Sequence, residues 1–237
     1  MRRVFARWWR EQRDELSIPA VLKRMLALAW DFLRDSFPDR RRQRYGDAEY
    51  DWEHRVDTTS ATLNWRTRLL GVFNSPYQPV PSEEFREMMA ALSIDFPRFT
   101  FIDIGSGKGR ALLLAMEFAF RRIIGIELLP ELNEIAMQNV RRFNSRGESR
   151  NCELLCQDVA DFEFPAEPAV VFLFNPLPVK SLKKVLRRLE ESLRISPREI
   201  YIAYANPVFD ETVAISRTWA RIAHTSTYSL YRSQSEC

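Results

Sequence analysis

The sequence predicts an α/β fold: a doubly wound, mostly parallel seven-strand sheet with a C-terminal antiparallel hairpin, preceded by a helical N-terminal extension. From residue 100 onward, short apolar runs alternate with segments whose apolar residues recur at helical spacing, which is the order of a parallel sheet covered by helices on both faces. The last two runs alternate apolar and polar residues and are almost contiguous, which indicates a hairpin at the sheet edge. The chain has 237 residues, 46% of them hydrophobic, so it can bury a full core.

The first 45 residues differ from the rest in charge. They contain 12 Lys and Arg against 6 Asp and Glu, whereas the remaining residues contain 23 against 26. Helical spacing predicts helices over residues 3–15 and 20–34, and Pro38 with the arginines after it ends the second helix. Such a segment either recruits a polyanion such as nucleic acid or packs its apolar stripe against the main domain, and we favour packing.

Export and membrane insertion are not predicted. Arg and acidic residues interrupt the N-terminal segment every few positions, so it holds neither a signal-peptide core nor about 20 consecutive apolar residues. The three cysteines favour free thiols in a reducing compartment, and the two histidines are isolated, so we expect no metal site. We therefore expect a cytoplasmic protein with no transmembrane segment.

Residues 46–79 contain many Tyr, Trp, Asp and Thr side chains without a sustained periodicity, which is typical of a lid or cap built from loops and short helices. Ser82, followed by two glutamates and an apolar pattern, predicts the N-cap of a helix that leads into the main domain. The predicted organisation is therefore an extension over 1–45, a lid over 46–79 and the main domain over 80–237.

In the main domain, predicted strands alternate with predicted helices. The predicted strands are residues 100–104, 123–127, 152–156, 169–174, 199–204, 219–225 and 227–232. The predicted helices between them are residues 110–118, 131–143 and 179–193. Five parallel strands followed by a hairpin result from this order.

The segment FIDIGSGKGR, residues 101–110, joins the first strand to the first helix through a glycine-rich turn. Gly105 permits a sharp turn, Gly107 permits close approach to a ligand and Gly109 permits close helix packing, with Ser106 between the first two. A strand, a glycine turn and a helix start together predict a ligand site.

The spacing of this turn distinguishes between ligands. Arg110 stands where a dinucleotide-binding G-x-G-x-x-G motif has its third glycine, and no Ser or Thr follows Lys108 as a phosphate-binding P-loop requires. Asp103 stands two residues before the first glycine, where its carboxylate would repel a pyrophosphate. The same carboxylate would attract a cation such as the sulfonium and ammonium groups of S-adenosylmethionine.

The turn resembles motif I, D-x-G-x-G-x-G, of class I seven-strand, Rossmann-like S-adenosylmethionine-dependent methyltransferases. The resemblance implies that Glu127, at the end of the second strand, accepts hydrogen bonds from both ribose hydroxyls. It implies that Asp158, after the third strand, takes the adenine amino group, with Val159 beside it. Asn175, after the fourth strand, would contact the cofactor where the methyl group is presented. The implied cofactor is S-adenosyl-L-methionine.

Two upstream segments extend the resemblance. Residues 50–59, YDWEHRVDTT, resemble stretches in bacterial methyltransferase-domain proteins of undefined substrate. The loop before motif I in seven-strand protein-lysine methyltransferases is similar to the segment with Tyr77, Pro79, Pro81 and Ser82, which implies that Tyr77 contacts the cofactor. The prolines are equally consistent with a rigid linker that starts a helix.

The resemblance implies an enzyme that transfers a methyl group to an acceptor, such as an amine nitrogen of a protein side chain or of a small molecule. Asn175 and Pro176 resemble the Asn-Pro-Pro-aromatic motif of amino-group methyltransferases, in which the asparagine and the following carbonyl hold the target nitrogen. Leu177 and Pro178 depart from that pattern. The alternative is that Asn175 and Pro176 only end the strand. A nucleic-acid acceptor is not favoured.

His54, Tyr204 and Asn206 are further candidates for the site. His54 would act as a base from the lid or would be a hydrogen-bonded structural residue, and the second is favoured. Tyr204 and Asn206, near the end of the fifth strand, would line the same cleft as Asn175 and Pro176.

Two other classes of protein share such a fold. One is a nicotinamide-dependent oxidoreductase, for which we find no catalytic Tyr-Lys pair or His. The other is a catalytically silent binding module.

Overall fold

The computed structural model describes residues 17–34, 48–59, 78–144, 151–174, 177 and 179–234. The chain divides into two units: Tyr50–Thr58 with Val80–Cys237, and Met1–Glu49 with Thr59–Pro79. In the second of these units, helix α2 (Ile18–Arg34) confirms the helix predicted over residues 20–34, whereas the helix predicted over 3–15 lies outside the described residues. No described helix combines the length and the apolar character that crossing a bilayer requires.

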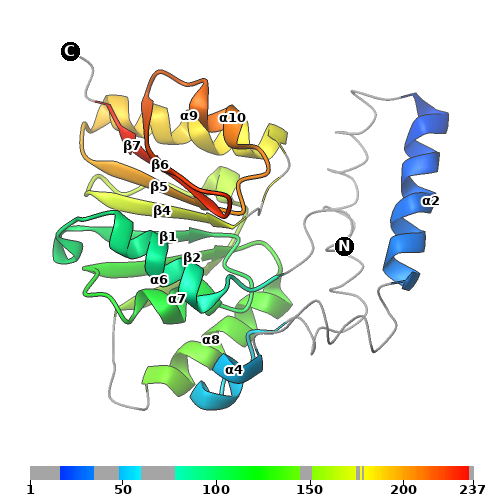
Figure 1. Ribbon diagram of the computed structural model, residues 1–237, viewed down its shortest axis with the longest axis horizontal. Helices are drawn as coiled ribbons and strands as arrows, with labels where there is room; N and C mark the ends of the chain where they lie inside the picture. Colours follow the sequence, from blue (N-terminus) through cyan, green and yellow to red (C-terminus); the bar gives the residue numbers. More distant parts are fainter. Residues whose placement is uncertain are drawn as a thin grey trace. The chain divides into compact units, whose positions relative to one another are not determined.

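The larger unit is built on one seven-stranded sheet (Figure 1). Its strands are β1 (Thr100–Ile104), β2 (Arg122–Glu127), β3 (Cys152–Cys156), β4 (Ala169–Phe174), β5 (Ile200–Ala205), β6 (Trp219–His224) and β7 (Tyr228–Ser233). Their order across the sheet is β3-β2-β1-β4-β5-β7-β6, with β1 to β5 parallel and β7 antiparallel to both of its neighbours. The predicted fold class is confirmed.

Strand β1 lies between β2 and β4, so the chain order reverses beside it. Thr100 pairs with Arg122 on one side and with Ala169 on the other, so the three strands run in step to the same edge. Open parallel sheets bind ligands at the carboxyl ends of the strands, where the strand order reverses. The glycine turn after β1 lies at that position.

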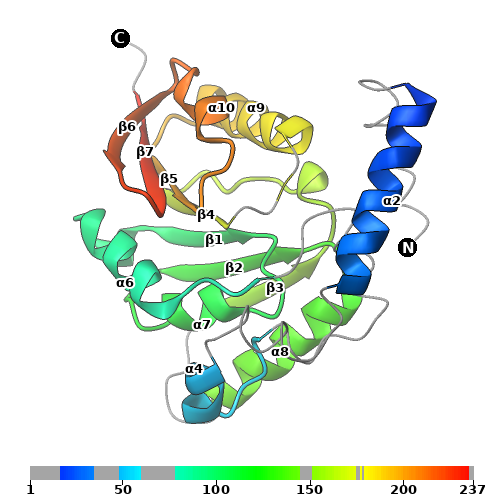
Figure 2. The same cartoon turned by 45° about the vertical axis from the view of Figure 1, so that its right-hand side comes forward.

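Helices cover both faces of the sheet (Figures 1 and 2). One face carries α6 (Ser82–Ala91), α7 (Arg110–Ala115) and α8 (Pro130–Asn144), and the other carries α9 (Val179–Ile195), α10 (Asp210–Ala214) and the 3-10 turn η3 (Val159–Asp161). In β1, Phe101 packs into the first face and Ile102 into the second, and every residue of the strand is buried. A strand that is buried on both faces reads as a near-continuous apolar run, and β4, AVVFLF, has that pattern.

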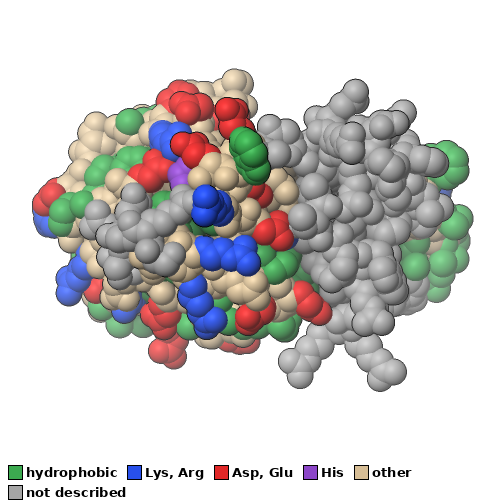
Figure 3. Space-filling view, turned by 90° about the horizontal axis from the view of Figure 1, so that it is seen from below, with side chains coloured by type: hydrophobic (Ala, Val, Ile, Leu, Met, Phe, Trp, Pro, Cys, Tyr) green, Lys and Arg blue, Asp and Glu red, His purple; other side chains and the backbone are tan. Residues whose placement is uncertain are grey.

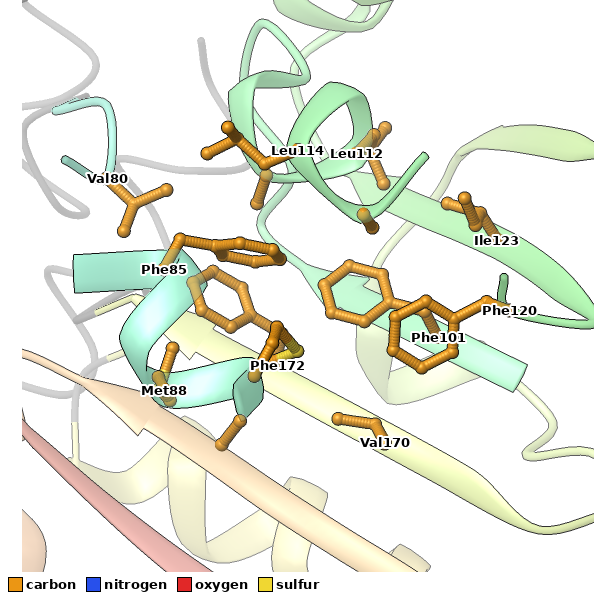
Figure 4. Close-up of a cluster of buried hydrophobic side chains, with 14 of the residues drawn as sticks. Val80, Phe85, Met88, Phe101, Leu112, Leu114, Phe120, Ile123, Val170 and Phe172 are labelled. Carbon is orange, nitrogen blue, oxygen red and sulfur yellow. The ribbon is translucent and has the colours of Figure 1, made fainter. Parts of the chain in front are cut away.

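Phenylalanine rings fill the face beneath α6 (Figure 4). The ring of Phe85 on α6 meets those of Phe101, Phe118 and Phe172 edge to face, with centroids 5.8, 6.2 and 5.4 Å apart. Edge-to-face pairs add roughly 0.5–1.5 kcal/mol each to the burial of apolar area. Phe85 therefore ties α6 to β1 and β4.

Two local predictions were wrong. Helix α7 ends at Ala115 instead of residue 118, because the chain closes in tighter turns with Phe118 N donating to Ala115 O. Ser82 is the first residue of α6 and not its N-cap; the cap position is Pro81, which offers no side-chain hydrogen bond. The Ser82 hydroxyl instead accepts a hydrogen bond from Arg110 Nη1 at 3.5 Å.

Candidate functional site

The glycine turn leaves β1 with three glycines in the left-handed region. Gly105, Gly107 and Gly109 have φ values of 78°, 55° and 87°, which L-residues with a Cβ adopt only with strain. The N–H groups of Gly105 and Ser106 both donate to Ile126 O, at 2.8 and 3.1 Å. The turn is thus fastened to the carboxyl end of β2.

Two glycines allow the turn to pack closely against its neighbours. A Cβ on Gly109 would lie 3.3 Å from Ala136 Cβ of α8, so the predicted close packing at Gly109 is made with that helix. A Cβ on Gly125 of β2 would lie 2.6 Å from Leu112 Cδ1 and 3.0 Å from Ser106 Oγ. We did not predict the role of Gly125, although an isolated glycine within a strand pattern signals close backbone approach.

Glu127 ends β2 and supports the turn. Its carboxylate accepts hydrogen bonds from Gly107 N at 2.9 Å and from Leu129 N at 2.8 Å, and its side chain is buried. Burial raises the pKa of Glu127, and the backbone N–H donors oppose that rise. Each carboxylate oxygen can accept a second hydrogen bond, so the group retains acceptor capacity for a ligand.

Asp103 lies on β1, two residues before the turn, and is also buried. Burial, with a further contribution from the charge of Glu127, raises the pKa of Asp103 to about 8. Among the described residues, no Lys or Arg forms an ion pair with either carboxyl group. Two acids without a basic partner at the edge of a sheet favour a ligand that carries positive charge.

The two basic residues of the motif lie against a different segment. Lys108 Nζ is 2.7 Å from Asp57 Oδ1, and Arg110 Nη2 is 3.0 Å from Asp51 Oδ1. Both basic side chains are buried, and burial lowers the pKa of Lys108 while Asp57 opposes that change. Sequence reasoning missed both residues, although two charges within a glycine turn, together with an acidic segment over 50–59, were a signal.

Asp158 and Val159 follow β3 at the same edge of the sheet. Asp158 is the N-cap of η3, where its Oδ1 accepts a hydrogen bond from Ala160 N at 2.9 Å. Gln157 N donates to Glu127 O at 3.0 Å, so the chain leaving β3 lies next to the end of β2. The structure thus brings the predicted acids Asp103, Glu127 and Asp158, at or just beyond the carboxyl ends of β1, β2 and β3, to one edge. Their roles in binding stay predictions.

Other predicted site residues lie elsewhere. Tyr77, Asn175 and Pro176 fall outside the described residues, so their roles also stay predictions. Tyr204 packs into the core beneath α9 and α10 instead of lining a cleft, so that prediction was wrong. Asn206, at the end of β5, is exposed.

His54 lies in the short helix α4 (Ala48–His54), which is seen beside α8 in Figures 1 and 2. Its ring stacks on Tyr50 with centroids 4.1 Å apart and on Phe143 of α8 at 5.8 Å. Its Nδ1 hydrogen-bonds to Tyr50 O at 3.0 Å. These contacts support the structural interpretation of His54.

No protein-family model and no curated protein matches the sequence. Among solved structures, the Escherichia coli protein yhhF, classed as a methyltransferase, superposes with a TM-score of 0.51 at 16% identity over 68% of this chain and 91% of its own. A Haemophilus influenzae protein classed as a methylase gives a TM-score of 0.48 at 16% identity over 65% and 99%. An RNA methyltransferase from Salinibacter ruber in complex with S-adenosyl-L-homocysteine gives 0.44 at 20% identity over 65% and 91%. The first similarity, at this identity, establishes the fold.

Proposed function

We propose that this chain is an S-adenosylmethionine-dependent methyltransferase. The observation that carries the proposal is the distribution of charge around the turn Gly105–Gly109. The buried carboxyl groups of Asp103 and Glu127 lie at the ends of the adjoining strands, whereas the motif's own basic side chains, Lys108 and Arg110, are paired with a different segment. This arrangement suits a cationic adenosyl ligand.

The residues present fit that cofactor. A cationic ligand would favour the ionised form of Asp103, and Glu127 has acceptor capacity for a pair of vicinal hydroxyl groups. Ser106 contributes a buried hydroxyl that has no hydrogen-bond partner in the described part of the chain. The resemblance assigns the adenine end to Asp158 and Val159. When bound, S-adenosylmethionine supplies a methyl group already activated on a sulfonium. The protein would mainly align the acceptor and exclude water.

The same charges argue against a nicotinamide dinucleotide. A pyrophosphate placed at this turn would face Asp103 and Glu127, and would need Lys108 or Arg110 to turn away from Asp57 and Asp51. Lys108 and Arg110 are buried, and separating a buried charge from its partner is strongly destabilising. The other alternative is a binding module without catalytic activity, and an assay of methyl transfer distinguishes it from an enzyme.

For the acceptor, we propose an amine nitrogen of a protein side chain or of a small molecule, held by Asn175 and Pro176 beside the cofactor, with Tyr77 as a further cofactor contact. On the face of the larger unit seen in Figure 3, acidic and basic side chains of the described residues are interspersed. A surface that binds nucleic acid would instead carry a cluster of basic side chains.

The free thiols of Cys152 and Cys156 suit a reducing compartment, and we propose that the reaction takes place in the cytoplasm.

Isothermal titration calorimetry of the full chain tests the proposal. We expect saturable binding of S-adenosylmethionine and of S-adenosylhomocysteine, and no heat of binding with NADH or NADPH. Binding of a nicotinamide dinucleotide without binding of S-adenosylhomocysteine would overturn the proposal. Transfer of a labelled methyl group to pooled amines and proteins then separates an enzyme from a silent module.

A further inference from the structure

We propose that the segment Tyr50–Thr58 is part of the cofactor site and that Lys108 and Arg110 are positioning residues that hold the glycine turn through it. The inference rests on the proposed function, since it concerns the same turn. Three side chains carry it, namely Lys108, Arg110 and Asn139.

Lys108 stands within the turn, between Gly107 and Gly109, and its side chain is 0% exposed. Its Nζ lies 2.7 Å from Asp57 Oδ1, 51 residues earlier in the chain. A lysine buried to this degree needs a paired charge, because desolvation of an uncompensated ammonium is costly. The position of the Asp57 carboxylate therefore determines the direction in which the Lys108 side chain points.

Arg110, the first residue of α7, makes a second link. Its Nη2 donates to Asp51 Oδ1 at 3.0 Å, its Nε donates to Thr58 Oγ1, and its guanidinium lies 4.2 Å from the centroid of the Tyr50 ring. Thr58 N donates in turn to Asp51 Oδ2 at 2.7 Å, so both ends of the segment are tied to one guanidinium. A planar guanidinium with several donors suits such multiple contacts.

Asn139 of α8 makes a third link, and its side chain is fully buried. Its Nδ2 donates to Asp57 O at 2.8 Å and to Lys108 O at 2.9 Å, while its Oδ1 accepts from Asp57 N at 2.9 Å. One amide thus joins the backbone of the segment directly to the backbone of the turn.

These links bear on binding because the turn holds three residues in left-handed conformations, and glycine loses more conformational freedom on ordering than any other residue. If the segment left the turn, Lys108 and Arg110 would lose their carboxylate partners and would have to reorient. A ligand would then bear the free-energy cost of ordering the turn. If the contacts between the segment and the turn only stabilised the fold, breaking them would lower thermal stability and leave the affinity for the cofactor unchanged.

The experiment is a double-mutant cycle with Asp57→Asn and Lys108→Met in the full chain. The dissociation constant for S-adenosylhomocysteine is measured by calorimetry, and the melting temperature by circular dichroism. We expect each single variant to weaken binding about tenfold, and the double variant to weaken it by about the same factor, because the pair acts as a unit. Glu83→Gln, on α6 and outside the segment, is the control, since the Glu83 side chain is 92% exposed. It should bind like the wild type.

Thr58→Val provides a second variant of similar volume if Asp57→Asn does not fold. It removes the hydroxyl that accepts from Arg110 Nε and donates to Asp51, and we expect it to weaken binding about threefold. If the folded variants bind S-adenosylhomocysteine with unchanged affinity and melt at a lower temperature, the contacts serve stability alone and the inference is overturned. Absence of binding by the wild type would instead overturn the proposed function.

Discussion

The backbone N–H of Gly107 donates to the carboxylate of Glu127 at 2.9 Å, across 20 residues of sequence. One carboxyl group, at the end of β2, therefore shapes the turn that follows β1. Because a second acceptor position remains on each oxygen, the same group can hold the turn and contact a ligand. Loss of this side chain should affect both stability and binding.

Replacing Glu127 separates these two effects. Glu127→Ala leaves the N–H groups of Gly107 and Leu129 without an acceptor, which should lower the free energy of unfolding by about 1–3 kcal/mol. We also expect S-adenosylhomocysteine to bind roughly tenfold more weakly, measured by calorimetry below the melting temperature. Glu131→Ala, at an exposed position in the first turn of α8, is the control and should change neither quantity. If folded Glu127→Ala binds S-adenosylhomocysteine with normal affinity, Glu127 does not contribute to the binding site.

Asp103 should make stability depend on pH. Its pKa of about 8 in the folded protein lies above its ordinary value of 3.8, so between these values the folded state holds a proton that the unfolded state has released. The contribution of this group to stability is complete below about pH 4 and is lost as the pH rises through about 8. Urea unfolding at pH 5 and pH 8 should show a smaller loss of stability for Asp103→Asn than for the wild type. Equal losses would contradict the prediction.

The same carboxyl group should couple binding to proton release. A cationic ligand favours the ionised form of Asp103, so S-adenosylmethionine should bind more tightly as the pH rises from about 6 to 8. Calorimetry in buffers of different ionisation enthalpy should detect the released proton. Asp103→Asn should bind more weakly and without this dependence on buffer. A wild-type binding enthalpy that is the same in all buffers would count against an ionising Asp103.

Gly125 should tolerate no side chain while Leu112 is present. In Gly125→Ala the new methyl group would lie 2.6 Å from Leu112 Cδ1 and 3.0 Å from Ser106 Oγ. Overpacking of this kind typically costs about 1–3 kcal/mol, which chemical denaturation measures. The cost should be smaller when Gly125→Ala is introduced into a Leu112→Ala background, because the overlapping methyl group is gone. The same cost in both backgrounds would mean that the strain lies elsewhere.

Phe85 should be among the most sensitive core positions, because it packs edge to face against three other rings. Phe85→Ala should lower the free energy of unfolding by about 3–5 kcal/mol. Glu83→Ala, on the same helix with a side chain that is 92% exposed, should change it by less than about 0.5 kcal/mol. A small loss for Phe85→Ala would indicate that the core refills the space.

The elements of the sheet were predictable because their patterns are local. Strands β1, β3 and β4 have the bounds that were predicted, because polar, proline or glycine residues flank these mainly apolar segments. The C-terminal end of α7 and the cap of α6 were not predicted. Helix α7 ends early in local hydrogen bonds such as that from Phe118 N to Ala115 O, which the apolar spacing does not reveal. The cap of α6 depends on a tertiary contact, because the Ser82 hydroxyl accepts from Arg110.

The sequence by itself determined the α/β class, the parallel order closed by a hairpin and the glycine turn with an acid two residues before it, because these features follow from periodicity and spacing. Only the tertiary structure decided the directions in which the charges of that turn point. Lys108 and Arg110 appear in the sequence as neighbours of the glycines of the turn, but they are buried against Asp57 and Asp51 of a segment about 50 residues earlier. Spacing along a chain carries no information about such a pairing. Folding selects it because a charge removed from water must meet an opposite charge.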